Sequence, residues 1–198
     1  MNDTKIILRR GRPRTFDRKE ALAKAQKLFH KRGYDSVSIA DLTDAIGINP
    51  PSFYAAFGSK LALYGEALQL YEENEGLDVE TALKPERPLA AGIAEIFRQA
   101  ADAYASGYAK GCMVIEGARG IVDREASASA RSRLEASRRF IDERIALHDA
   151  ARAALLTDYV MMTLSGLSAS AGNGIDAVRL RELATMAAAG AGRYIEGT

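Results

Sequence analysis

The sequence predicts an all-α protein, with an N-terminal three-helix head followed by a larger helical domain. Three observations support this prediction. Alanine is abundant and runs of β-branched residues are scarce, a composition that favours helix. Apolar residues recur at three- and four-residue spacing along most of the chain. Capping residues and glycines stand where these periodic segments begin and end.

The first two helices are delimited by local signals. Asp17 is a good N-cap, and Glu20 three positions later completes a capping-box pattern. Gly33 is placed to end this helix in a left-handed conformation. A second, shorter helix is expected to begin at Ser38, whose hydroxyl can cap the first turn, and to end at Gly47.

A three-residue turn and two prolines introduce the third helix. The turn over residues 47–49 contains glycine, as expected of a helix-turn-helix. Pro50 and Pro51 then fall in the first helical turn, where a backbone N–H has no intrahelical partner, so they mark the start of the helix without removing a hydrogen bond. Phe53 and Phe57 lie four apart and are expected to face the first two helices.

The rest of the chain reads as further helices. A fourth helix is expected to begin at Lys60. The polar segment 77–88 contains two prolines and is predicted to be a connection. The remaining expected helices cover 89–106, 126–150, 153–171 and 176–195, with a short glycine-punctuated segment at 111–121.

Charge is distributed unevenly along the chain. Residues 1–65 carry 12 Lys and Arg against 6 Asp and Glu, whereas residues 66–198 carry 15 against 20. A basic N-terminal region indicates an acidic partner such as nucleic acid, although a solvated tail has the same composition. The single cysteine excludes an internal disulfide and fits a cytoplasmic protein. No apolar run approaches the roughly 20 residues of a membrane span, so no membrane association is predicted.

The run FDRKEALAKAQKLFHKRGYDSVSIADLTDAIGINPPSFYAAFGSKLALY, residues 16–64, resembles the DNA-binding region of the TetR family of transcriptional regulators. The likeness rests on several features that agree in order and spacing over about 50 residues, and beyond them only length and helical pattern agree. It implies a basic flexible arm at 1–14, a helix-turn-helix domain at 15–60, and a ligand-binding and dimerisation domain at 61–198, in which 61–76 is a connecting helix. It also implies a homodimer, a small-molecule effector and a palindromic double-stranded operator.

The DNA contacts are expected from the arm and from the second to fourth helices. By position in the resemblance, Tyr54 and Lys60 contact phosphates, and Ser38 offers a hydroxyl or helix-end N–H groups. The third helix has no Arg, Gln or Asn from 50 to 59, so the bidentate pairs that read guanine and adenine are missing from it. The candidate DNA-binding residues are Arg10, Arg12, Arg14, Ser38, Pro50, Pro51, Ser52, Tyr54, Ala55 and Lys60.

The arm can compensate for this deficit. Arg10-Gly11-Arg12-Pro13 resembles a minor-groove hook, in which glycine lets the backbone enter the groove and arginines seek its negative potential in A·T-rich DNA. The alternative is a non-specific basic tail.

The effector site is less well defined by the sequence. A mostly apolar cavity is expected, and its candidate lining is Phe97, Tyr104, Tyr108, Cys112, Met113, Glu116, His148 and Met162. Cys112 is either a sensor or a small buried hydrophobe, His148 is equally a core histidine, and Glu116 can instead pair with Arg119 on the surface. No ligand spacing indicates a metal site, and no cofactor is predicted.

The last two helices, at about 153–171 and 176–195, are rich in small residues that allow close approach between helices. They are the expected dimer interface, and packing within one subunit is the alternative.

The leading interpretation is a sequence-specific transcriptional regulator, a repressor released by a small molecule, and an activator or dual regulator is left open as the close variant. The chain offers no nucleophile–base set, phosphate loop or metal motif, which argues against an all-helical enzyme with an incidental basic arm. A DNA-coating architectural protein is the other alternative. The sequence names neither the effector nor the operator.

Overall fold

The computed structural model describes residues 16–106 and 108–197, and every regular element in these ranges is a helix. The expectation of an all-α protein with a helix-turn-helix head is confirmed. The basic arm at 1–14, with Arg10, Arg12 and Arg14, lies outside the described residues. The helices are α1 (Arg18–Arg32), α2 (Ile39–Ile46), α3 (Pro50–Phe57), α4 (Lys60–Glu75), α5 (Val79–Ala82), α6 (Leu89–Ala105), α7 (Met113–Gly120), α8 (Arg124–Asp149), α9 (Ala153–Gly172) and α10 (Ala177–Glu196).

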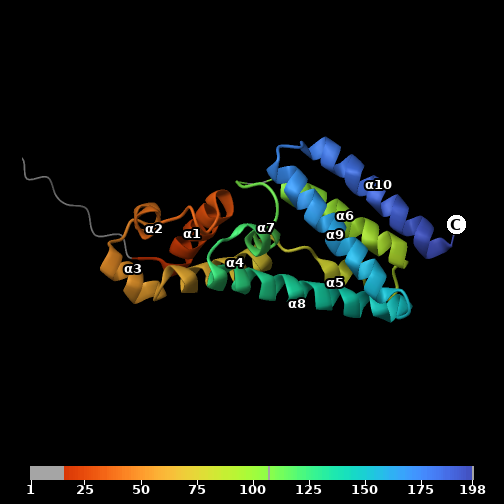
Figure 1. Ribbon diagram of the computed structural model, residues 1–198, viewed down its shortest axis with the longest axis horizontal. Helices are drawn as coiled ribbons and strands as arrows, with labels where there is room; N and C mark the ends of the chain where they lie inside the picture. Colours follow the sequence, from red (N-terminus) through yellow and green to blue (C-terminus); the bar gives the residue numbers. More distant parts are fainter. Residues whose placement is uncertain (1–15, 107, 198) are drawn as a thin grey trace, which may run out of the picture.

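The head consists of α1, α2 and α3 at one end of an elongated molecule, with the C-terminus at the other end (Figure 1). Helix α4 leads from the head into the body, so its first half closes the head core and its second half belongs to the body. Phe29 of α1 packs edge-on against Tyr64 of α4, with ring centroids 5.2 Å apart. Burial of such rings is the main source of stability for so small a unit.

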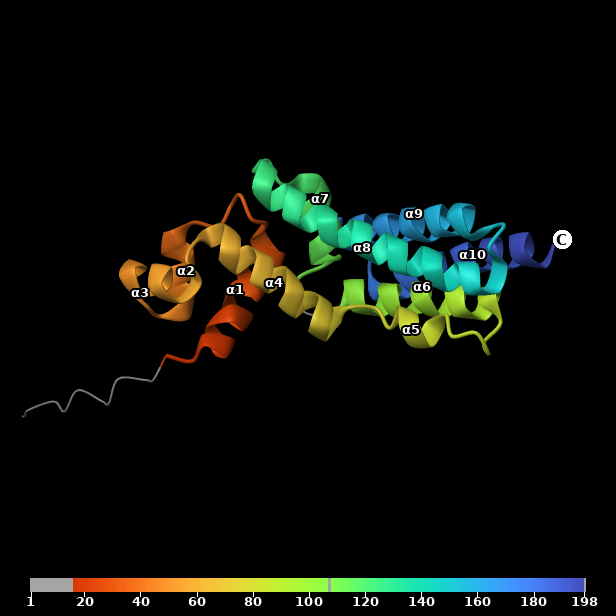
Figure 2. The ribbon, with the colours of Figure 1, turned by 90° about the horizontal axis from the view of Figure 1, so that it is seen from below.

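The body is a helical bundle in which α10 packs on α6 and α9, while α8 runs alongside α7 and α9 (Figures 1 and 2). Helix α7 sits between the head and the body in both views. Close approach between α7 and α4 requires glycine at 117, because an added Cβ would lie 2.4 Å from the hydroxyl of Tyr64. The body is thereby held against the helix that carries the head.

One segment differs from the sequence-based expectation. The connection at 77–88 contains a single helical turn, α5, whose first turn is capped by Asp78 through the N–H of Thr81 at 3.0 Å. Four residues are too few to show helical periodicity in a sequence. The other helix boundaries agree with the expected ones to within two residues.

Candidate DNA-binding head and effector cavity

Helix α2 begins with a reciprocal capping arrangement. The Ser38 Oγ accepts the N–H of Asp41 at 3.1 Å, and the Asp41 carboxylate accepts the N–H of Ser38 at 2.8 Å. The hydroxyl of Ser38 also donates to this carboxylate. Hydrogen bonds from Ser38 and from Arg32 hold the pKa of Asp41 well below its usual range. The Ser38 hydroxyl caps α2 as expected and donates to Asp41 in the structure, and its contact with a phosphate stays a prediction.

Helix α3 separates an anchoring side from an outer side. Asn49 caps it, since its side chain accepts the N–H of Ser52 at 2.9 Å, and Pro50 and Pro51 occupy the first two positions. Phe53 and Phe57 are buried on one side, as expected. The outer side is exposed and consists of Pro51, Ser52, Tyr54 and Ala55, with Pro50 at the start of the helix also exposed. The Tyr54 side chain is 52% exposed, although the edge of its ring meets Phe53.

Lys60, at the start of α4, lies on the head's own surface. Its Nζ is 3.9 Å from the ring centroid of Tyr34, and partial burial lowers its pKa. A cation–π contact of this kind contributes on the order of 0.5–1 kcal/mol, less than a well-placed ion pair to phosphate. The side chain can therefore be released from Tyr34 by a phosphate group.

Arg18 has a structural role that sequence reasoning missed. Its guanidinium bonds the carboxylate of Glu66 at 2.7 Å and the carbonyl of Ala56 at 3.3 Å, and lies 5.0 Å from the ring centroid of Phe57. It thus fastens α1 to α3 and α4. The partners are 38 to 48 residues away, so no local signal could have indicated them.

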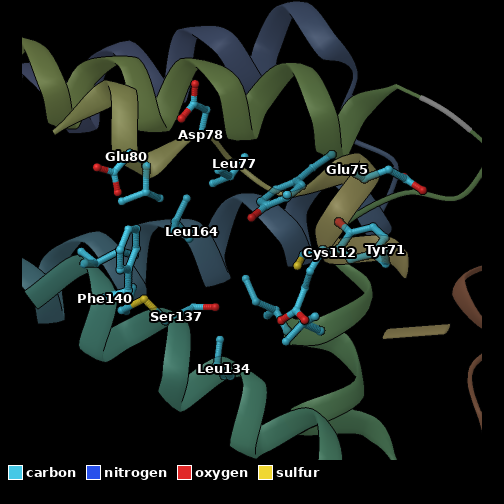
Figure 3. Close-up of a pocket in the computed structure, with 18 residues that line it drawn as sticks. Tyr71, Glu75, Leu77, Asp78, Glu80, Cys112, Leu134, Ser137, Phe140 and Leu164 are labelled. Carbon is cyan, nitrogen blue, oxygen red and sulfur yellow. The ribbon is translucent and has the colours of Figure 1, made fainter. Parts of the chain in front are cut away.

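A cavity of about 300 Å³ opens in the body between the end of α4, α5, α8 and α9 (Figure 3). Tyr71, Tyr104 and Cys112 form one part of its wall. Burial raises the pKa of all three groups. The apolar lining residues are Leu77, Val79, Val114, Ile115, Leu134, Phe140, Ile141, Met161 and Leu164, and the lining also includes Glu72, Glu75, Gly76, Asp78, Glu80 and Ser137.

The structure brings only two of the eight candidate effector residues, Tyr104 and Cys112, to this cavity. Phe97 is fully buried and its ring packs against Tyr159 instead. Tyr108 is 61% exposed, beneath the ammonium of Lys31.

The other four candidates also lie elsewhere. Met113 and Glu116 line a separate depression between α1 and α7. His148 bonds the carbonyl of Leu83 at 3.2 Å. Met162 is exposed while Met161 faces the cavity, because adjacent residues on a helix point about 100° apart.

His30 of α1 joins the head to the cavity wall through one hydrogen bond and one ring contact. His30 of α1 bonds the carbonyl of Gly111 through Nε2 at 3.1 Å, and its ring meets Tyr71 edge-on with centroids 5.1 Å apart. Burial lowers the pKa of His30. The N–H of Cys112 in turn donates to Ser168 Oγ at 2.9 Å. His30 therefore contacts a wall residue, Tyr71, through its ring, and the residue next to Cys112, Gly111, through a hydrogen bond.

A second link lies on the other side of α7. Asp35, after α1, accepts the N–H of Val122 at 2.7 Å and that of Asp123 at 3.3 Å. The head is therefore joined to the body on both sides of α7, which limits the motions available to it.

Within residues 16–106 and 108–197 there is no helix of the length and apolarity needed to cross a membrane. The same residues hold no group of three or more His, Cys, Asp or Glu side chains arranged for a metal ion.

Comparison with known proteins places the chain in a family. Residues 16–67 match bacterial regulatory proteins of the tetR family. The chain is 39% identical to the HTH-type transcriptional repressor BdcR of Escherichia coli (strain K12) over 178 residues, which cover 89% of this chain and 90% of BdcR.

Solved structures agree with this assignment. A cysteine mutant of the TetR family transcriptional regulator CifR, complexed with 26-base-pair operator DNA, superposes with a TM-score of 0.79 at 35% identity, covering 89% of this chain and 98% of CifR. The TetR-family regulator SCO4454 of Streptomyces coelicolor, at 16% identity over 87% of this chain and 92% of its own, shares the fold with a TM-score of 0.74. The chain therefore belongs to the TetR family of bacterial regulatory proteins, which makes it a DNA-binding transcriptional regulator.

Proposed function

We propose that the protein is a homodimeric repressor that holds a palindromic operator through α3 and releases it when a small molecule fills the body cavity. The observation that carries the proposal is the outer side of α3, where Ser52, Tyr54 and Ala55 are exposed while Phe53 and Phe57 anchor the helix. A helix presented in this way fits the major groove. The relatives that are repressors, and CifR with its operator, support the same reading.

Affinity comes mainly from phosphate contacts, and sequence preference from apolar contacts and DNA shape. Tyr54 and Lys60 are the proposed phosphate contacts beside α3. Pro51 and Ala55 can contact thymine methyl groups, but neither can make a bidentate hydrogen bond to a base. The basic arm is proposed to supply a preference for A·T-rich flanks through the minor groove.

The dimer is proposed to form through α9 and α10. Their outer surface carries Leu155, Met162 and Met186, which are 58%, 64% and 70% exposed. Gly166 lies on the same surface with open space around its Cα, so a second subunit can approach closely there. Exposed apolar side chains on neighbouring helices are typical of an interface.

Release is proposed to begin at the Cys112 wall. An occupant that displaces this wall perturbs the Gly111 carbonyl and the Tyr71 ring, both of which contact His30 in the last turns of α1. The occupant shifts the population toward a head orientation with the wrong spacing for two half-sites. The difference between the occupant's affinities for the DNA-binding and released states limits the extent of that shift.

The test of DNA recognition is selection from a random duplex pool, followed by anisotropy titrations at several salt concentrations. If the protein is a sequence-specific regulator, the selected duplexes should share a palindromic consensus. Bound duplexes without an enriched sequence would support a coating protein, and failure to retain any duplex would support an enzyme. The double variant Tyr54→Ala with Lys60→Ala should lose affinity, and its salt dependence should flatten by about one unit per lost phosphate contact. Lys84→Ala, at an exposed lysine of the body, is the matched control. Undiminished affinity in the folded double variant would refute the assignment.

The arm and the dimer have separate tests. Deleting residues 1–14 should weaken binding and relax the preference at the flanks; an unchanged footprint and preference would exclude the hook. Gly166→Glu should give monomers in sedimentation experiments, while Ala136→Glu on the exposed side of α8 should remain dimeric. A dimeric Gly166→Glu variant would place the interface elsewhere.

A further inference from the structure

The geometry of the cavity points to the chemical class of its occupant: a small, mainly apolar, uncharged molecule that carries one hydrogen-bond-accepting oxygen, such as a ketone or an ester. This inference deepens the proposed function and rests on it, since it names the kind of effector that the body takes.

The polar part of the cavity wall offers donors to an incoming oxygen. Tyr71 and Tyr104 line the cavity together with Cys112. Burial keeps both phenols protonated, so each retains a proton to donate. Sulfur is a weak acceptor, so a carbonyl oxygen that enters the cavity is the better partner for these hydroxyls. Figure 3 shows the sulfur of Cys112 among the side chains that line the cavity.

The remainder of the wall sets the size and polarity of the molecule. The cavity of about 300 Å³ corresponds to roughly ten water volumes, enough for a compact molecule of about ten non-hydrogen atoms. Leu134, Ile141 and Leu164 approach from α8 and α9 and can make only apolar contacts. A single ring or short branched chain with one oxygen matches this wall.

An anion is excluded by the charge of the lining. Among the residues that the structure describes, the lining includes four carboxylates, those of Glu72, Glu75, Asp78 and Glu80, and no Lys, Arg or His. A carboxylate or phosphate would lose its hydration in the cavity and gain no cation in return.

The four carboxylates already have partners within the protein. Glu72 is paired with Arg133 and Glu80 with Arg144. Asp78 caps α5, and Glu75 accepts the side-chain amide of Gln26 at 3.0 Å. Figure 3 shows the Glu75 side chain directed away from Cys112. Arginines neutralise two of the four carboxylates, and the other two each accept one N–H, so an ammonium group competes with existing contacts, whereas an uncharged molecule does not.

The proposed oxygen site coincides with the link to the head. A ligand oxygen that accepts the Tyr71 hydroxyl proton shifts the ring that His30 contacts, and a shift of Cys112 moves the adjacent Gly111 carbonyl. The part of the wall that recognises the oxygen is therefore also the part through which occupancy reaches α1.

Four probes of similar size separate the chemical classes: acetophenone, ethylbenzene, benzoate and the phenethylammonium ion. Calorimetric titration of the full-length protein should give acetophenone about tenfold tighter binding than ethylbenzene, the value of one or two net hydrogen bonds. Benzoate and phenethylammonium should bind more weakly than acetophenone. Tighter binding of either ion, or no binding of acetophenone, overturns the inference.

Two tyrosine variants locate the oxygen. Tyr104→Phe should lower acetophenone affinity toward that of ethylbenzene and leave ethylbenzene unchanged. Tyr108→Phe, at an exposed tyrosine outside the cavity, should change neither. If Tyr104→Phe leaves the preference for acetophenone intact, the oxygen site is wrong.

Duplex binding by the unliganded protein is measured on the same samples. Loss of the ketone preference with intact, palindrome-specific DNA binding refutes the effector class alone. Absence of sequence-specific DNA binding refutes the proposed function, whatever the probes do.

Discussion

Replacing Gly111 by alanine is expected to lower the free energy of unfolding by roughly 2–4 kcal/mol. Gly111 has φ +81°, a left-handed conformation that costs an L-residue roughly 1–2 kcal/mol. An added Cβ would also lie 3.0 Å from both the carbonyl oxygen and the Oγ of Ser168. That hydroxyl accepts the N–H of Cys112 at 2.9 Å and donates to Glu116 at 2.6 Å, so moving it weakens two bonds worth about 0.5–1.5 kcal/mol each.

A matched variant separates the two contributions. Gly174 has φ +90° and nothing within 4 Å of an added Cβ, so Gly174→Ala should show only the conformational cost of roughly 1–2 kcal/mol. Both variants are compared with the parent protein by urea denaturation at one protein concentration, because association would make the midpoint concentration-dependent. If Gly111→Ala costs no more than Gly174→Ala, the packing of Ser168 against Gly111 does not stabilise the fold as argued.

Three further predictions concern the head. Phe53→Ala should lower the free energy of unfolding by about 3–5 kcal/mol, because the ring is fully buried. Melting curves followed by circular dichroism would show this loss, and a loss below about 1 kcal/mol would contradict the place of Phe53 in the core. Asn49→Ala should cost about 1 kcal/mol in the same assay through loss of the α3 cap, and Asn49→Asp, which can also cap, serves as the control. Burial depresses the pKa of His30 in the folded state, so the unfolded chain binds the proton more readily and stability should fall as pH drops below about 6.5. His30→Gln should lessen that fall between pH 7.5 and pH 5.5 in urea midpoints, and an identical pH profile would show that His30 does not cause it.

Most helix boundaries were predictable because their signals are local. Asp17, Ser38 and Asn49 each accept backbone N–H groups two or three residues away, and Gly47 ends α2 in the left-handed conformation expected of it. Pro50 and Pro51 occupy the first turn of α3 as expected, because the backbone N–H groups of a first turn have no partner within the helix. These interactions do not depend on the rest of the fold.

The candidate effector residues were less predictable because cavity walls assemble from distant segments. Residue type and helical spacing make Met113 and Met162 candidate lining residues. Adjacent side chains on a helix point in different directions, however, so a shift of one position decides whether a side chain faces the cavity, the core or solvent. The lining residues of α5 could not be found from periodicity, since that helix is one turn long. Tyr71 was also missed, since it reads simply as one more apolar position on α4.

The order of the helices and the buried side of α3 follow from the chain alone, since caps, glycines, prolines and the spacing of Phe53 and Phe57 act within a few residues. Tertiary packing decided three other features: the closure of the cavity, the ring beneath Lys60 and the His30–Gly111 bond. The last of these joins groups 81 residues apart. The physical reason is that a contact between remote segments depends on the relative rotation of whole helices, a quantity set by the summed packing of the core and encoded at no single position.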